Sequence, residues 1–171
     1  VIVPQKKSAQ AARKRPRVSA DVLMQLYEKM LTLYFVEERT KIFVKSNKCS
    51  FHASSRGHEK LQIGIAMLLQ ARKDWFFPYY REKALMVGLE MPLKDLFLGM
   101  LSREGDPNSN GRNMSEHFSS KDLRIVSPTA CTGSQYLPAV GMAKSVVANG
   151  GDEIVYVSSG EGATSEGEYF E

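Results

Sequence analysis

The chain has 171 residues, of which 43% are hydrophobic and 25% charged, and this is enough to bury the core of one globular domain. No apolar run approaches the roughly 20 residues that a membrane-spanning helix needs. The N-terminal segment also lacks the apolar core and cleavage site of a secretory signal, so neither a membrane protein nor a secreted one is expected.

The net charge of +4 is distributed unevenly. Residues 1–18 hold six basic residues and no acidic one, so their charge of +6 leaves −2 on the rest of the chain. Such a run is typical of a disordered, solvated arm. We therefore expect a disordered basic tail over residues 1–18 and an incomplete folded domain over residues 19–171. Binding of the tail to nucleic acid or to an acidic partner is the alternative.

Helical periodicity dominates the first hundred residues. Ser19 and Asp21 can cap a first helix, along which apolar residues recur in steps of three and four. The second segment is apolar nearly all round, which predicts a buried helix. The aromatic segment 73–80 contains Pro78 and is predicted to be a short connection or a strand. The predicted helices span residues 19–46, 58–70, 81–89 and 93–101.

The second half of the chain predicts an α/β arrangement. Residues 102–121 are polar and rich in Gly, Asn and Ser, which indicates a long loop of functional importance. A helix is expected over 135–148 and the clearest strand over 153–159, followed by a glycine-rich turn that opens another helix. A strand, a turn and a helix are half of a βαβ unit, so further parallel strands are expected.

The turn Gly160–Ala163 is the strongest local signal. Its glycines allow close approach of the backbone to a ligand, and the expected helix would direct N–H groups at phosphate. Because the carboxylate of Glu161 repels phosphate unless a hard cation bridges them, the pattern predicts a diphosphate bound through Mg²⁺. A plain glycine-rich turn with Glu161 solvated or capping the helix is the alternative. The segment fits a dinucleotide-binding fingerprint poorly and is not a P-loop.

Four motifs in order make this prediction more specific. Together they resemble the alpha part of the thiamin-dependent 2-oxo acid dehydrogenases, over roughly residues 20–171. The resemblance implies the α/β thiamin-diphosphate-binding fold, a parallel sheet flanked by helices, of which this chain would be an N-terminal fragment. The motifs are Tyr79-Tyr80-Arg81-Glu82, the segment from Gly111 to His117, Thr132-Gly133-Ser134-Gln135 with Ala139-Val140-Gly141, and the segment from Gly160 to Gly167.

The resemblance implies a set of cofactor residues. The family binds the cofactor diphosphate through a Tyr-Arg pair and the metal through the acidic residue of the Gly-x-Gly turn, where many members carry Asp and the branched-chain type carries Glu. A second metal ligand and a phosphate-binding histidine would lie beyond residue 171. An alternative alignment places Ser127-Pro128 at the position that contacts the aminopyrimidine. The matching residues are Tyr80 and Arg81 for diphosphate, Glu161 for Mg²⁺, Gly162 and Ala163 for backbone contacts, and Thr132 for the aminopyrimidine.

Three further residues are candidates on the substrate side. His52 aligns with a family position that is often His, so it is expected to donate a proton or orient the oxo acid, with an ordinary loop histidine as the alternative. Arg112 and His117 would contact the anionic substrate or order the long loop.

Cys131 is expected to be a small buried residue. Because the two cysteines show no metal-binding spacing, a reduced, cytoplasmic compartment is expected.

The resemblance implies oxidative decarboxylation of a 2-oxo acid, either branched-chain or pyruvate, with acyl transfer to a lipoyl group of a partner protein. The expected partners are a beta subunit or fused beta domain, which supplies the activating glutamate, and a lipoyl-bearing acyltransferase, within an oligomer. The fragment alone is expected to be inactive. The alternatives are a transketolase-like thiamin enzyme without a lipoyl acceptor, and a nucleic-acid or scaffold protein that acts through the basic tail.

Overall fold

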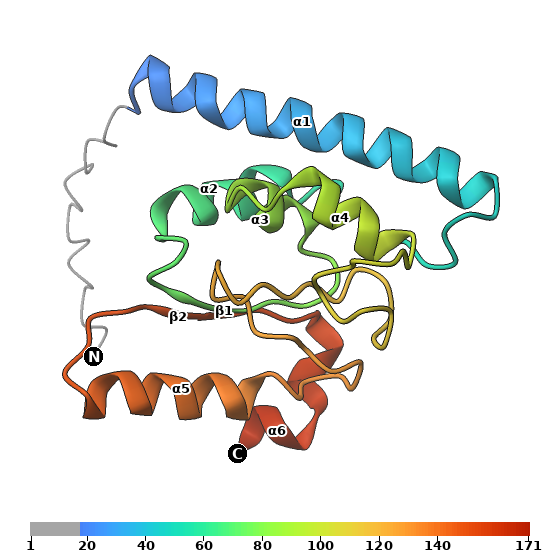
Figure 1. Ribbon diagram of the computed structural model, residues 1–171. Helices are drawn as coiled ribbons and strands as arrows, with labels where there is room; N and C mark the ends of the chain where they lie inside the picture. Colours follow the sequence, from blue (N-terminus) through green and yellow to red (C-terminus); the bar gives the residue numbers. More distant parts are fainter. Residues whose placement is uncertain (1–17) are drawn as a thin grey trace, which may run out of the picture.

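The computed structural model describes residues 18–171 and shows helices on both sides of a small parallel sheet (Figure 1). Most of the expected basic tail, residues 1–17, lies outside the described residues. No described helix is long and apolar enough to cross a bilayer. The helices are α1 (Ala20–Lys45), α2 (Glu59–Leu68), α3 (Lys83–Gly88), α4 (Leu93–Met100), α5 (Tyr136–Ala148) and α6 (Gly167–Phe170), with a 3₁₀ helix over Glu161–Ser165.

The sheet pairs β1 (Trp75–Phe77) with β2 (Val155–Val157) in parallel. Phe76 lies opposite Tyr156 in the register. On the other side of β1, Phe76 also forms an isolated parallel bridge with Ile125. Strand β1 therefore lies between β2 and the Ile125 segment, with Phe76 and Phe77 buried and Trp75 half-buried.

The elements form three layers. Helices α1–α4 cover one side of the strands, and α5 and α6 lie on the other (Figure 1). This arrangement confirms the predicted α/β class at the level of helices around a parallel sheet. The hydrophobic core contains buried apolar side chains from α1, α2, β1, α3, α4 and the segment 118–125, among them Leu33, Ile63, Phe76, Leu85, Met86, Leu96, Phe118 and Ile125.

The apolar pattern of the sequence predicts the start of α1 correctly but not the burial of α2. Helix α1 begins as predicted, because the Ser19 hydroxyl accepts a hydrogen bond from the Val22 N–H at 3.3 Å. The expected burial of α2 on all sides is wrong. Ile63 is fully buried, but Leu61 and Leu68 are 65% and 84% exposed. Only one face of α2 packs against α1 and α3, so an all-round apolar composition does not by itself produce an all-round buried helix.

The glycine-rich turn also differs from expectation. It opens a 3₁₀ helix, Glu161–Ser165, rather than a continuous α-helix. Glu166 then adopts an extended conformation (φ −84°, ψ 154°) and separates the 3₁₀ helix from α6. The Thr164 hydroxyl donates to the Glu161 carbonyl at 2.8 Å, a local bond that favours a tight turn. The backbone therefore folds back here before the chain becomes α-helical.

Close contact between α2 and α3 depends on Gly88. A Cβ atom at Gly88 would lie 2.4 Å from the Ala66 Cβ and 3.3 Å from the Ile63 Cα. We predict that Gly88→Ala lowers the free energy of unfolding by about 1–3 kcal/mol, because this site cannot accept another methyl group without moving a helix. The matched control is Gly64→Ala in α2, where a Cβ would meet nothing within 4 Å. That variant should be neutral or stabilising by about 0.5–1 kcal/mol. Urea denaturation of both variants tests the pair, and equal effects would contradict the packing argument.

Candidate functional site

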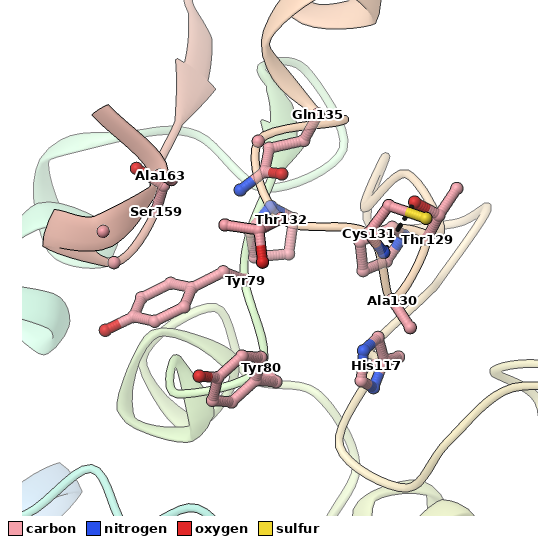
Figure 2. A pocket seen from close by; sticks show the side chains of 15 residues that line it. Tyr79, Tyr80, His117, Thr129, Ala130, Cys131, Thr132, Gln135, Ser159 and Ala163 are labelled. Atoms are coloured by element: carbon pink, nitrogen blue, oxygen red, sulfur yellow. Dashed lines mark hydrogen bonds between the residues drawn. The ribbon is translucent and has the colours of Figure 1, made fainter. Parts of the chain in front are cut away.

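Residues that lie far apart in the sequence line one cavity of about 270 Å³. The walls are the turn after β1, the long loop, the segment 128–133 and the glycine-rich turn after β2 (Figure 2). Thr132 lies on this surface, and so does Pro128 of the alternative pair Ser127-Pro128, whereas Ser127 does not. The expected site residues that line the cavity are Tyr80, His117, Thr132, Gly162 and Ala163.

Aromatic rings form one side of the cavity. The ring centroids of Tyr79 and Tyr80 are 5.3 Å apart, and those of Tyr80 and His117 are 6.1 Å apart. Phe51 packs edge-on against Tyr80 at 5.9 Å and supports it from the loop that precedes α2. Figure 2 shows Tyr79 and Tyr80 on the side of the glycine-rich turn and His117 across from that turn. The arrangement suits a planar, partly apolar ligand with a polar end.

A buried carboxylate connects the Tyr80-Arg81 turn to β2. Glu82 accepts a hydrogen bond from the Tyr156 hydroxyl at 2.6 Å and another from the Ser158 hydroxyl. Burial raises the pKa of Glu82 although both hydroxyl groups lower it. On the other side, the Gln135 side-chain amide donates to the Ser158 carbonyl at 2.7 Å. These bonds fix the end of β2 directly below the glycine-rich turn.

The remaining candidates lie outside the cavity lining. Arg81 is half-buried, with its guanidinium carbon 5.5 Å from the centroid of the Tyr80 ring, which itself lines the cavity. Glu161 is exposed at the start of the 3₁₀ helix. Arg112 is exposed in the long loop, where its Nε donates to the Ser109 carbonyl at 3.0 Å. Among residues 18–171, no group of three or more His, Cys, Asp or Glu side chains could hold a metal ion.

His52 belongs to a buried cluster of four charged side chains, Glu37, His52, Lys83 and Glu116, which we call the charge quartet. Its Nδ1 lies 2.9 Å from Glu116 Oε1, and its Nε2 lies 3.2 Å from Glu37 Oε2, off the direction of a good hydrogen bond. Lys83 Nζ lies 2.5 Å from Glu116 Oε1 and 3.6 Å from Glu37 Oε1. The side chains of Lys83, Glu37 and Glu116 are at most 1% exposed. With His52 protonated, the quartet is neutral.

Comparison with known proteins identifies the family of this chain. The family model described as "Dehydrogenase E1 component" matches residues 27–171. The chain belongs to this family. It is 34% identical over 146 residues to the 2-oxoisovalerate dehydrogenase subunit alpha of Bacillus subtilis (strain 168), covering 85% of this chain and 44% of the relative.

Two other members of the dehydrogenase E1 family extend this result. The chain is 28% identical over 154 residues to the 2-oxoisovalerate dehydrogenase subunit alpha of Pseudomonas aeruginosa, which covers 90% of this chain and 37% of the relative. It is 24% identical over 156 residues to the pyruvate dehydrogenase E1 component subunit alpha of Staphylococcus aureus (strain Mu50), with 91% of this chain and 39% of the relative covered. The chain thus spans less than half the length of these relatives.

Two pKa shifts describe the electrostatics of the charge quartet in this E1 chain. The hydrogen bond to Glu116, followed by the interaction with Glu37, raises the pKa of His52 to about 9, although burial and the charge of Lys83 oppose this. Burial alone would raise the pKa of Glu37, but the interaction with His52 and the charge of Lys83 outweigh it and lower the pKa to about 2. The raised pKa of His52 and the lowered pKa of Glu37 both favour a protonated, charged His52 at neutral pH.

The raised pKa of His52 predicts a pH dependence of stability. A folded-state pKa of about 9, above the ordinary value of 6.5, means that the imidazolium stabilises the fold fully below pH 6.5. This stabilisation is lost as the pH rises from 6.5 through 9. The melting temperature should therefore fall over this window, and it should fall less steeply in His52→Gln. Parallel curves for the two proteins would show that His52 is not charged in the folded state.

Several residues of the site escaped prediction from the sequence. Tyr79 and Gln135 belong to the family motifs but had no expected role, and both line the cavity with Cys131, which is exposed rather than buried as expected. Cys131 lies in the segment 129–132, whose four residues are all exposed and form no helix or strand. Lys83 was also missed, although a lysine directly before the run Ala-Leu-Met-Val is a signal for a buried charge that needs partners.

Proposed function

We propose that the cavity binds thiamin diphosphate and that the chain forms part of the thiamin-diphosphate-binding fold. The observation that carries this proposal is the convergence of Tyr80, Thr132, Gly162 and Ala163 on one cavity. These positions come from three separate segments and match three of the four motifs of the family. A chance match of short motifs would not require them to share a surface.

The local geometry fits this cofactor. A Cβ atom at Gly162 would meet nothing within 4 Å, so the backbone there borders open space that a ligand can approach closely. We propose that Gly162 and Ala163 contact the diphosphate through the backbone, and that Tyr80 and Arg81 bind its oxygens with side-chain donors. Thr132 would contact the aminopyrimidine ring through its backbone. The bound cofactor would supply the carbanion that attacks the oxo carbon of the substrate.

We propose that the carboxylate of Glu161 is a ligand of Mg²⁺. Mg²⁺ takes carboxylate and phosphate oxygens and retains several waters, so one exposed carboxylate beside a diphosphate suits it. Within residues 18–171, Glu161 belongs to no group of three or more His, Cys, Asp or Glu side chains that could hold a metal ion. We therefore propose that the remaining ligands come from the diphosphate, from water and from other parts of the full-length protein.

The proposed reaction is oxidative decarboxylation of a 2-oxo acid with acyl transfer to a lipoyl group on an acyltransferase partner. The relatives named 2-oxoisovalerate dehydrogenase favour a branched-chain substrate, and those named pyruvate dehydrogenase keep pyruvate open. Both ring nitrogens of His52 face carboxylates. We therefore propose that His52 is a charged residue that acts through Glu37 and Glu116 and does not itself contact the substrate. We propose that Arg112 orders the long loop, in agreement with its bond to Ser109.

The proposal includes a beta subunit or fused beta domain and a higher oligomer. Exposed apolar side chains on α2, α5 and α6 support further packing partners, among them Leu68 at 84%, Val147 at 77% and Phe170 at 76%. A cytoplasmic location is also part of the proposal, and the free thiols of Cys49 and Cys131 support it.

Calorimetric titration of thiamin diphosphate into the full-length protein with its beta partner tests the site. We predict Mg²⁺-dependent binding that weakens about tenfold or more in Glu161→Ala. Gly162→Ala should also weaken binding, without loss of stability, because its methyl group would enter open space. The control is Glu104→Ala, an exposed residue of the long loop. Equal affinities in all four proteins, or no binding by the wild type, would overturn the cofactor assignment, and an acyl-acceptor assay separates lipoyl from transketolase-type transfer.

A further inference from the structure

Glu116 combines three unusual properties. Its residue is 3% exposed, its carboxylate lies in the charge quartet, and its backbone has a φ of +66°. A non-glycine residue rarely adopts this left-handed conformation, and it persists only where neighbouring contacts hold it. The next residue, His117, lines the cavity beside Tyr80. Consecutive side chains thus serve two separate sites.

The contacts of Glu116 join the two loops that border the site. Oε2 accepts a hydrogen bond from the Ala53 N–H at 2.5 Å, which ties the long loop to the segment before α2. Oε1 contacts both Lys83 Nζ, at 2.5 Å, and His52 Nδ1, at 2.9 Å. A carboxylate with three donors on two oxygens has little freedom to rotate or withdraw. The backbone of Glu116 is held with it.

The ring of His117 depends on this backbone. Its main-chain N–H donates to the Met114 carbonyl at 3.3 Å, and its Nδ1 lies 3.2 Å from the Ser115 carbonyl. Both partners precede Glu116 in the same loop, so neither ties His117 to the rest of the fold. Two neighbours of His117 connect it to the core, Glu116 through its carboxylate and Phe118 through apolar packing, and of these two only Glu116 also reaches the charge quartet.

We propose that Glu116 is a positioning residue whose carboxylate, held by Lys83, His52 and the Ala53 N–H, fixes the left-handed backbone that presents His117 to the cavity. Lys83 lies at the start of α3, two residues after Arg81, so its ion pair with Glu116 connects that carboxylate to the Tyr80-Arg81 turn. Its ammonium group also compensates the negative charge of Glu37. Through these contacts the charge quartet couples the Tyr80-Arg81 turn to His117. The cavity's role as a cofactor site is taken from the proposed function.

Two variants of Glu116 separate its carboxylate from its backbone conformation. Glu116→Gln keeps the shape of the side chain and removes its charge, while Glu116→Gly removes the side chain and tolerates positive φ. Both should weaken thiamin diphosphate binding to the full-length protein with its partner by about tenfold, as calorimetry measures it. Both should also shift the His117 signal in spectra of ring-¹³C-labelled histidine, because the ring moves relative to Tyr80. The control Asp122→Asn, in an exposed ion pair with Arg72, should leave both values unchanged.

The outcomes are distinct. If Glu116→Gly keeps the wild-type affinity and the wild-type His117 signal, the carboxylate is not required and the proposal is overturned. If the wild type does not bind the cofactor, the proposed function fails, and the His117 signal alone then decides whether Glu116 positions the ring. Should Glu116→Gln fail to fold, Glu116→Gln with Lys83→Met removes one buried charge of each sign and gives the same two readouts.

Discussion

Replacing Lys83 with methionine is expected to lower the free energy of unfolding by about 3–5 kcal/mol. The ammonium group is fully buried and lies between Glu37 and Glu116, whose side chains are also buried. Methionine fills a similar volume, so the effect comes from charge rather than from a cavity. The variant leaves two buried carboxylates with only the imidazolium of His52 for compensation.

Urea denaturation of the full-length chain measures this effect, with Lys73→Met as the matched control. Lys73 forms an ion pair with Asp152 at 2.7 Å, but both side chains are substantially exposed, 38% and 82%. Exposed pairs contribute about 1 kcal/mol or less, so the control should change little. Similar effects of the two variants would mean that water reaches the quartet and solvates its carboxylates.

The Lys83 variant also has an electrostatic signature. The charge of Lys83 lowers the pKa of His52, whereas the hydrogen bond to Glu116 raises it. The pKa of His52 should therefore rise in Lys83→Met and fall in Glu116→Gln, although both variants lose stability. Histidine resonances followed against pH distinguish the two directions. General loosening of the fold would instead move both variants toward the ordinary value of 6.5.

Most of the secondary structure could be predicted because it depends on local signals. Helix α1 follows from a capping serine and a regular apolar period, α4 from an apolar period after Pro92, and the end of α5 from Asn149-Gly150-Gly151. For the segment of β1, the sequence predicts either a short connection or a strand. Its identity is set by pairing with β2 and Ile125, residues that lie far along the chain and that no local pattern reveals.

The candidate site likewise contains residues that local sequence signals predict and residues that only long-range contacts bring together. Tyr80, Thr132 and Gly162 could be chosen by motif, but their meeting on one cavity depends on the parallel sheet that brings their segments together. The charge quartet could not be predicted, because its four residues come from four separate segments. In the sequence, Glu37 and Glu116 resemble ordinary surface charges, and nothing local links them to Lys83 or His52. Burial and partner geometry, which only the folded chain supplies, turn them into one cluster.

The other large effect is expected at Arg81. Its carbonyl accepts bonds from the Ser55 hydroxyl at 3.1 Å and the Gln62 amide at 3.2 Å, so the backbone is fixed. Within residues 18–171, its guanidinium donates a long bond of 3.4 Å from Nη1 to the Ser54 carbonyl. Burial raises the pKa of the Tyr79 hydroxyl, and the nearby guanidinium of Arg81 opposes this rise. A guanidinium has five N–H donors, so several remain available for an anion at the edge of the cavity.

We therefore predict that Arg81→Ala weakens thiamin diphosphate binding about 100-fold and Arg81→Lys about tenfold, because the ammonium group of lysine lacks the planar pair of donors. Calorimetry on the full-length protein with its partner should be repeated with thiamin, which has no phosphate. If Arg81 binds the diphosphate, both variants keep the wild-type affinity for thiamin. Equal losses for the two ligands would instead show that Arg81 acts by supporting Tyr80, whose ring it contacts. Arg72→Lys, at an exposed pair with Asp122, should change neither affinity.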